Sequence, residues 1–393
     1  MAARYPTLRV ALAVAGSLTL LILAFAIHRG WTTNAHSKWA RILPASTTSN
    51  SYSSAGLQVL QDVFNETLGF QKIFVINLPS RTDRRDTISL AAALTGLKID
   101  FVDGVTDWDE RILPPGATEA NLGKGNTGAW RAHMNVARTT VEQNLTSALV
   151  LEADVDWDIR IKSQMQDFAK ASQLLLQPDR ANDRMYVSEH MPRMSSSSPY
   201  GDVNAWDLLW IGHCGTHFPS EEEKDIGVPA GRVAIPDDET VPESQHVNIQ
   251  FGNDDLINQY PNHTRVVSRA RMNVCTLAYG MSQQGARRFL YQLGIKRIQS
   301  ATDIMFRDLC DGLAGRPLHA CLTVQPQLFQ HHRPVGAKST FSEIANHGEE
   351  YNERAFTRNV RWSTRLNYEK LLYGKTDFVD LFPDGEPATD LGF

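Results

Sequence analysis

Residues 147–158 read Ser-Ala-Leu-Val-Leu-Glu-Ala-Asp-Val-Asp-Trp-Asp, an apolar run that ends in four acids at alternating positions. The run Leu149–Leu151 is typical of a strand buried on both faces of a sheet. Ligands of open α/β sheets bind at the carboxyl ends of strands, and period-two spacing places Glu152, Asp154 and Asp156 on one side of an extended chain. Three close carboxylates repel one another unless a cation lies among them, and Mg²⁺ and Mn²⁺ prefer oxygen ligands. The stretch therefore predicts a metal site, although a solvated loop or a helix N-terminus would look similar.

The sequence around this stretch alternates between apolar β-branched runs and helical patterns. Such alternation predicts an α/β domain with a mostly parallel central sheet covered on both faces. Polar stretches at 195–198 and 219–243 are expected to be surface loops, and the tail after residue 376 is expected to be loose. The expected strands are 72–78, 98–102, 147–151, 207–212 and 274–281, with a further one at 321–324; the expected helices are 82–97, 128–142, 285–293 and 302–309.

The composition is that of a globular protein, with 42% hydrophobic and 21% charged residues. It indicates neither a collagenous, a disordered nor a disulfide-dense chain. The net charge of -5 gives no electrostatic reason to expect nucleic acid as a partner.

The N-terminal region contains a stretch without charges, Val10–Ile27. Its 18 residues would span roughly 27 Å as a helix, which suits a thin bilayer. We expect an uncleaved signal anchor; a cleaved signal peptide and a buried helix are the alternatives. The expected layout is a type II membrane protein of the Golgi or endoplasmic reticulum, with residues 1–9 cytosolic, 10–27 in the membrane, 28–70 a flexible stem, 71–375 the lumenal domain and 376–393 a tail.

Four cysteines lie in the proposed lumenal body and lack the spacing of a zinc or redox motif. They indicate one or two disulfides, with Cys310–Cys321 the first pair to try, or else four buried thiols. Sequons at Asn65, Asn144 and Asn262 permit N-glycosylation.

Three segments occur in the order and rough spacing of a known family: Phe74–Arg85 (FVINLPSRTDRR), Gly128–His133 (GAWRAH) and Leu149–Asp154 (LVLEAD). In these segments the chain resembles glycosyltransferase family 25, which includes bacterial lipooligosaccharide and collagen galactosyltransferases, and it looks most like the fungal branch. The resemblance covers about residues 71–335. It implies a GT-A-like nucleotide-sugar-binding fold, a UDP-hexose donor, often UDP-galactose, and Mn²⁺ (or Mg²⁺). The family usually has Glu-Asp-Asp where this chain has Glu152-Ala153-Asp154, so the middle acid is missing.

The resemblance also suggests roles for individual residues. Arginines can chelate a diphosphate, and a carboxylate near the acceptor hydroxyl can serve as base. Each residue has an ordinary alternative as well: a turn, a solvated helix face, a packed core position or a helix cap. The donor-binding candidates are Asn77, Arg81, Arg84, Arg85, Asp103, Arg131, His133 and Glu152; the metal candidates are Asp154, Asp156 and His332, the second histidine of His331-His332; and the candidate base is Asp303.

Together these features favour an inverting, metal-dependent transfer of a hexose from a UDP-sugar to a glycan or glycoconjugate. The first alternative is an inactive relative that binds nucleotide-sugar or glycan. The second is a metal-dependent hydrolase or phosphotransferase, although no second acidic cluster or H-x-x-E-H spacing supports it.

Overall fold

The computed structural model describes residues 59–190, 196, 198–220, 222, 227–388 and 391. The predicted membrane anchor and most of the predicted stem lie outside these residues. Within the described part of the chain, no helix is long and apolar enough to cross a membrane.

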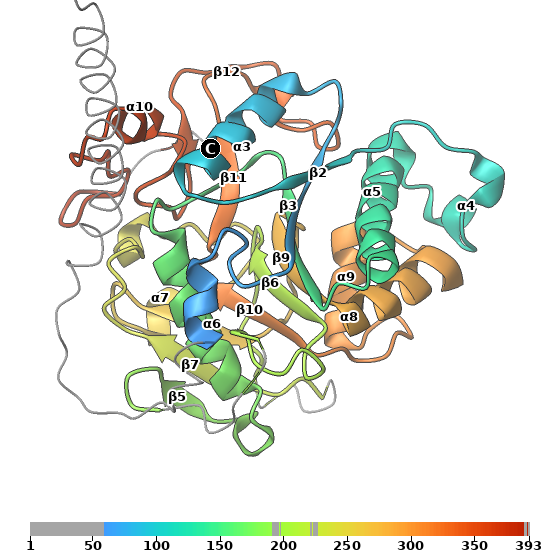
Figure 1. The fold of residues 1–393 in the computed structure, drawn as a ribbon, viewed down its shortest axis with the longest axis horizontal. Helices are drawn as coiled ribbons and strands as arrows, with labels where there is room; N and C mark the ends of the chain where they lie inside the picture. Colours follow the sequence, from blue (N-terminus) through green and yellow to red (C-terminus); the bar gives the residue numbers. More distant parts are fainter. Residues whose placement is uncertain are drawn as a thin grey trace, which may run out of the picture. The chain divides into compact units, whose positions relative to one another are not determined.

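A twelve-stranded sheet forms the centre of the described region, with the path β2-β1-β3-β9-β6-β10-β8-β7-β5 (Figure 1). Along this path β9 runs antiparallel to β3 and β6, and β8 runs antiparallel to β10 and β7. The other neighbouring pairs on the path are parallel. The sheet is therefore mainly parallel with two reversed strands, as the alternating sequence pattern predicts. The path strands are β1 Lys72–Asn77, β2 Asp100–Asp103, β3 Ser147–Glu152, β5 Arg184–Tyr186, β6 Leu208–Gly212, β7 Arg232–Ile235, β8 Arg265–Arg269, β9 Ala278–Ser282 and β10 Cys321–Gln325.

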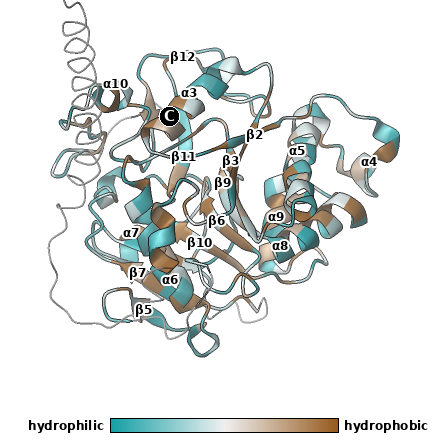
Figure 2. Ribbon diagram, viewed as in Figure 1, coloured by the Kyte–Doolittle hydropathy of each residue, from teal (hydrophilic) through white to brown (hydrophobic). Residues whose placement is uncertain are grey.

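Helices cover both faces of the sheet, because neighbouring strand residues point to opposite sides. Leu149 and Leu151 pack into one hydrophobic cluster with α3 and α6, whereas Ala148 and Val150 pack into another with α5, α8 and α9. Figure 2 shows hydrophobic residues concentrated in central strands such as β6 and β10. The helices are α3 Thr82–Leu94, α4 Ala117–Ala120, α5 Gly123–Glu142, α6 Ile161–Leu175, α7 Asp255–Gln259, α8 Gln283–Phe289, α9 Thr302–Asp311 and α10 Tyr368–Leu372, and a π-helical turn, Leu290–Lys296, extends α8.

Short strands beside the main path complete the edge at which β3 ends. The strand β11 (Phe329–Arg333) pairs with β6, with β4 (Val155–Trp157) and with β14 (Phe356–Thr357). A separate hairpin joins β12 (Gly336–Ala337) to β13 (Tyr351–Asn352). In Figure 1, β12 lies above β11.

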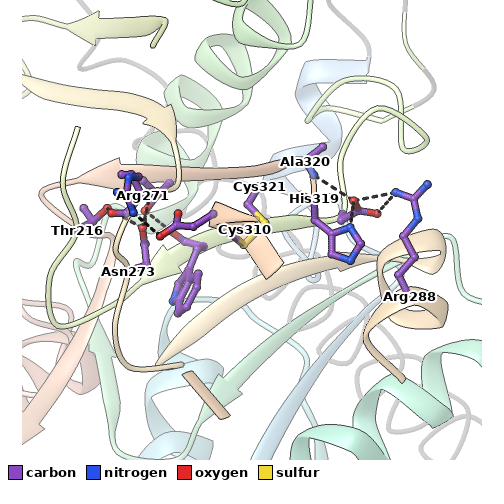
Figure 3. Close-up of a disulfide and its surroundings, with 12 residues drawn as sticks. Thr216, Arg271, Asn273, Arg288, Cys310, His319, Ala320 and Cys321 are labelled. Carbon is purple, nitrogen blue, oxygen red and sulfur yellow. Dashed lines mark hydrogen bonds and ion pairs between the residues drawn. A yellow bond between two sulfur atoms is a disulfide. The ribbon is translucent and has the colours of Figure 1, made fainter. Parts of the chain in front are cut away.

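Two disulfides link separate segments of the described region. Cys310–Cys321, the expected pair, ties α9 to β10, and Cys214–Cys275 joins the segments that follow β6 and precede β9. Figure 3 shows the first disulfide between a polar group around Arg271 and another around His319. Arg271 pairs with the buried Asp311 at 2.8 Å, which closes the end of α9.

Several expectations about boundaries are wrong. The stretch 219–243 is not entirely a surface loop, because it contains the buried strand β7. The ordered body begins before residue 71, since Leu60 and Val63 are buried against the core. The segment after residue 376 is not loose throughout, because Leu381 and Phe382 are buried in a small cluster with Phe356.

Candidate metal and nucleotide site

Three side chains, Glu152, Asp154 and His331, converge at the carboxyl edge of the sheet. Their ligand atoms all lie within 4.8 Å of one another, the spacing that a single cation would require. Glu152 ends β3, Asp154 lies in the turn that follows, and His331 belongs to β11. The group therefore combines two carboxylates that are two positions apart in the sequence with a histidine from a distant part of the chain.

The pairing of β4 with β11 brings the histidine to the acids. After the turn at Ala153-Asp154 the chain re-enters the sheet as β4, and Val155 lies opposite His331 in the antiparallel register. The backbone N–H of His332 donates to the carbonyl oxygen of Asp154 at 2.9 Å. The turn and this register, rather than one extended chain, determine which side chains meet.

Asp154 is ionised and incompletely bonded. Burial opposes its charge, but the positive charges of Arg84 and its basic neighbours lower the pKa of Asp154 to about 2. One oxygen, Oδ2, lies 3.6 Å from Nη1 of Arg84. The other, Oδ1, is buried and has no hydrogen-bond partner among the described residues. A buried carboxylate oxygen without a donor indicates a position prepared for a ligand.

His331 is suited to bind a cation in its neutral form. Burial lowers the pKa of His331 to about 4, although Asp154 acts in the opposite direction. Its Nδ1 lies 3.9 Å from Sγ of Cys214, and its Nε2 lies 3.9 Å from Oδ2 of Asp154. A proton on Nδ1 leaves the Nε2 lone pair directed at the acids.

Glu152 is oriented by a buried polar chain. Thr276 donates its hydroxyl to Oε1 of Glu152 at 2.7 Å, and Nε2 of His133 lies 3.6 Å from the same oxygen. Nδ1 of His133 is 2.8 Å from the hydroxyl of Tyr279. His133 is only 2% exposed, so its contact is with Glu152 inside the protein, whereas the sequence suggested direct binding of the sugar donor.

Asp156 and His332 are not in the metal group, contrary to the expectation from period-two spacing. Asp156 is fully buried and accepts hydrogen bonds from Thr357 at 2.7 Å and from Ser363. His332 contacts Thr357 through Nδ1 at 3.0 Å and lies beside Asp156. The chain turns at residues 153–154, so the side chains of Asp156 and His332 do not join the carboxylate of Asp154. They stabilise the junction of β4, β11 and β14 instead.

Asn77 lies at the end of β1, next to the turn after β3. Its Nδ2 donates to its neighbour Leu78 at 2.7 Å, and its Oδ1 is buried without a partner in the described part of the chain. The backbone N–H of Gly104 donates to the carbonyl oxygen of Asn77, so the end of β2 is fixed beside it, while the side chain of Asp103 is exposed. Of these two donor-binding candidates, Asn77 has a buried acceptor without a partner among the described residues.

The candidate arginines occupy different environments. Arg84 and Arg81 both pair with Glu343, and Arg81 also pairs with Asp83 at 2.7 Å. Arg85 is exposed and lies over the ring of Phe101 at 3.9 Å. Arg131 donates to Asn135 of its own helix at 3.0 Å. Among these arginines Arg84 is the one that contacts Asp154.

Asp303 is held near the site by the backbone that precedes β9. Its Oδ2 accepts from the N–H of Cys275 at 2.9 Å, and the next residue, Thr276, bonds to Glu152. Its Oδ1 accepts from the N–H of Ile304. The side chain is half-buried, which allows both the predicted role as base and a purely structural role in fixing the Cys275 loop.

Sequence reasoning missed the roles of Thr276, Glu343 and Arg365. Arg365 donates to the carbonyl oxygen of Ala153 at 2.9 Å and supports the turn. No local pattern marks these residues, because each reaches the site through tertiary packing. His331 was visible in the sequence, but a histidine pair does not reveal which member faces the acids.

The donor set fits a divalent cation. Two carboxylates and a neutral imidazole are ligands that Mn²⁺ accepts, and the buried Oδ1 of Asp154 has no other partner among the described residues.

Part of the chain that forms this site is similar to known proteins. Residues 70–195 match the family model described as Glycosyltransferase family 25 (LPS biosynthesis protein). Residues 70–195 are therefore similar to family 25 glycosyltransferases. This region contains Asn77, Arg84, Glu152 and Asp154, and it ends before His331.

Three relatives are procollagen galactosyltransferases. The chain is 26% identical to procollagen galactosyltransferase 2 of Mus musculus over 28% of its own length and 20% of the relative. It is 30% identical to procollagen galactosyltransferase 1-B of Xenopus laevis over 26% of its length and 19% of the relative. It is 28% identical to procollagen galactosyltransferase 1 of Danio rerio over 28% and 20%, respectively. The similarity thus spans about a fifth of the length of these relatives.

Proposed function

We propose that this chain is a metal-dependent, inverting glycosyltransferase that transfers a hexose, galactose in the first instance, from a UDP-sugar to a glycan or glycoconjugate in the secretory pathway. The observation that carries the proposal is the convergence of Glu152, Asp154 and His331 beside Arg84, with one carboxylate oxygen buried and unpartnered among the described residues. The similarity to procollagen galactosyltransferases supports sugar transfer as the reaction class.

Glu152, Asp154 and His331 would hold Mn²⁺ or Mg²⁺, which supplies positive charge to a leaving diphosphate. Arg84 lies next to these ligands and would bind a phosphate oxygen through its guanidinium. The polar chain Tyr279–His133–Thr276 keeps Glu152 in one orientation, so that little reorganisation is needed when a ligand binds.

Asn77 would recognise the nucleoside. Its buried Oδ1 can accept a hydrogen bond, and the imide N–H of uracil is a donor of the required type. A ligand without a donor at this position would leave the oxygen unpaired, which costs about 1–3 kcal/mol.

Asp303 would take the proton of the acceptor hydroxyl while the acceptor oxygen bonds to the anomeric carbon and the bond from that carbon to the UDP oxygen breaks, so that UDP leaves with the electron pair. Its link to Cys275, next to Thr276, places it on the same loop that supports Glu152. Both of its oxygens accept backbone hydrogen bonds, which fix the orientation of the carboxylate.

Incubation of the purified full-length chain with a panel of UDP-sugars and Mn²⁺, followed by measurement of released UDP, tests the proposal. We expect release with at least one donor, dependence on the metal, and loss of at least a hundredfold in Asp154→Asn. Absence of both turnover and metal-dependent UDP binding would exclude the enzyme. Metal-dependent binding without turnover would favour the alternative, an inactive nucleotide-sugar-binding relative.

A further inference from the structure

The β12–β13 hairpin, residues 336–352, extends over the arginines of the site. Its base is held by an ion pair between Lys338 and Glu350 at 2.6 Å, next to the two paired residues of each strand. Phe341 is 2% exposed and anchors the hairpin to the body. Beyond Phe341 the chain is exposed from Glu343 to Asn346.

Glu343 is the hairpin residue that reaches the site. Its carboxylate pairs with Nη1 of Arg81 and lies 3.2 Å from Nη1 of Arg84, whose same nitrogen is 3.6 Å from Asp154. The carbonyl oxygens of Thr340 and Phe341 accept further hydrogen bonds from the two arginines. One carboxylate therefore occupies Arg84, which borders the proposed metal ligand Asp154, together with the neighbouring Arg81.

A diphosphate bound to a cation at Asp154 would need the same guanidinium groups. A carboxylate and a phosphate compete for arginine because each is an anion with two oxygens that can accept the paired N–H donors of a guanidinium group. The side chain of Glu343 is already 38% exposed, so it can turn further into water, while Phe341 keeps the base of the hairpin in place. The ion pairs of Glu343 can therefore break while the base of the hairpin stays in place.

We propose that Glu343 is an intramolecular competitor that occupies the diphosphate-binding arginines until a nucleotide displaces it. This inference rests on the proposed function. It makes Glu343 a determinant of donor affinity: a ligand must carry enough negative charge to replace a carboxylate, so neutral sugars and nucleosides do not open the site.

Titration of UDP and, separately, of inorganic pyrophosphate into the full-length chain with Mn²⁺ tests this competition. In Glu343→Gln we expect both ligands to bind roughly three- to tenfold more tightly than in the wild type, the size expected when two partly exposed ion pairs no longer oppose binding. Glu349→Gln is the matched control, because it removes an equal charge from the same hairpin at an exposed position. Equal or weaker binding in Glu343→Gln, relative to Glu349→Gln, overturns the inference.

Hydrogen exchange in the wild type provides a second readout. The N–H groups of Ile344 and Ala345 donate to Ser342, and we expect them to exchange faster when UDP and Mn²⁺ are bound. Slower exchange would mean that the hairpin closes on the nucleotide instead of leaving, and would refute displacement.

The two probes separate this inference from the proposed function. Tighter pyrophosphate binding in Glu343→Gln, with no UDP binding by any variant, would support the competitor and exclude the nucleotide-dependent enzyme. Binding of neither probe by any variant would overturn both.

Discussion

His331→Leu removes the histidine that the structure places among the acids, while keeping a side chain of similar bulk. Nε2 of His331 lies 3.9 Å from Oδ2 of Asp154, and its ligand atom belongs to the group that spans at most 4.8 Å. The neighbouring His332 makes its contact with Thr357 instead, at 3.0 Å. Replacement of each of the two adjacent histidines is therefore expected to have a different effect.

The expected loss of metal affinity follows from the number of ligands. Outer-shell partners of a metal ligand are worth 10–100-fold in affinity, so removal of one of three protein ligands should cost at least that, or about 1.4–2.7 kcal/mol. Glu152 and Asp154 remain and keep a weak site. Because His331 is neutral at pH 7, with a pKa of about 4, its removal does not change the net charge of the site.

Mn²⁺ titration by calorimetry in the presence of UDP measures this effect, and urea denaturation measures stability in parallel. We expect His331→Leu to weaken Mn²⁺ binding with little change in the free energy of unfolding. The matched variant His332→Leu should keep its Mn²⁺ affinity and lose about 1–3 kcal/mol of stability, because it removes the hydrogen bond between His332 and the buried Thr357.

Two results would refute the assignment. Unchanged Mn²⁺ affinity in His331→Leu would show that the imidazole is not a ligand. Loss of Mn²⁺ binding in His332→Leu, with a normal urea transition, would restore His332 as the ligand that the sequence favoured.

Three further predictions follow from the same geometry. Asn77→Ala should raise the Kd for UDP by about tenfold and leave the Kd for pyrophosphate unchanged, because only the nucleoside reaches the buried Oδ1; equal weakening of both ligands would contradict this. Burial lowers the pKa of His213 from 6.5 to about 4, so the folded state binds a proton less readily than the unfolded state, and the free energy of unfolding falls as pH falls from 6.5 through 4. His213→Gln should remove about 3 kcal/mol of this acid dependence, which urea denaturation at several pH values measures. Replacing Cys214 and Cys275 together by alanine should lower the free energy of unfolding by roughly 4 kcal/mol for a sequence separation of 61 and should also weaken Mn²⁺ binding, because Cys214 contacts His331; the corresponding Cys310 and Cys321 variant should lower stability without altering Mn²⁺ affinity.

The strands and helices near the site were predictable because their patterns are local. The runs Ile73–Ile76 and Ala148–Leu151 are apolar throughout, and the structure places both inside the sheet as parallel neighbours. The strand β7 was not predicted, because it lies within an acidic, Pro-rich stretch and pairs with residues far away in sequence. The predicted strand 274–281 begins only at Ala278, since Cys275 has a φ of 64° and cannot be part of a regular strand.

The acids of the site were predictable, but their partners were not. Alternation identified Glu152 and Asp154, which follow a buried strand, yet the same rule also included Asp156. A single turn reverses that prediction, because the chain after Asp154 enters β4 and pairs with β11. Register between distant strands decides whether His331 or His332 faces the acids, and a one-residue change of register exchanges the two faces.

The missing acid at position 153 has a structural explanation. Ala153 is 3% exposed and packs in the apolar cluster that contains Val155 and Trp157. Its carbonyl oxygen accepts from Arg365, and its N–H donates to the carbonyl oxygen of Ile76, so the turn is held by backbone groups. An acid here would place a charge among apolar side chains, where it requires a partner. The two residues that flank it in sequence, Glu152 and Asp154, already supply both carboxylates of the metal group, so the cation site does not depend on an acid at position 153.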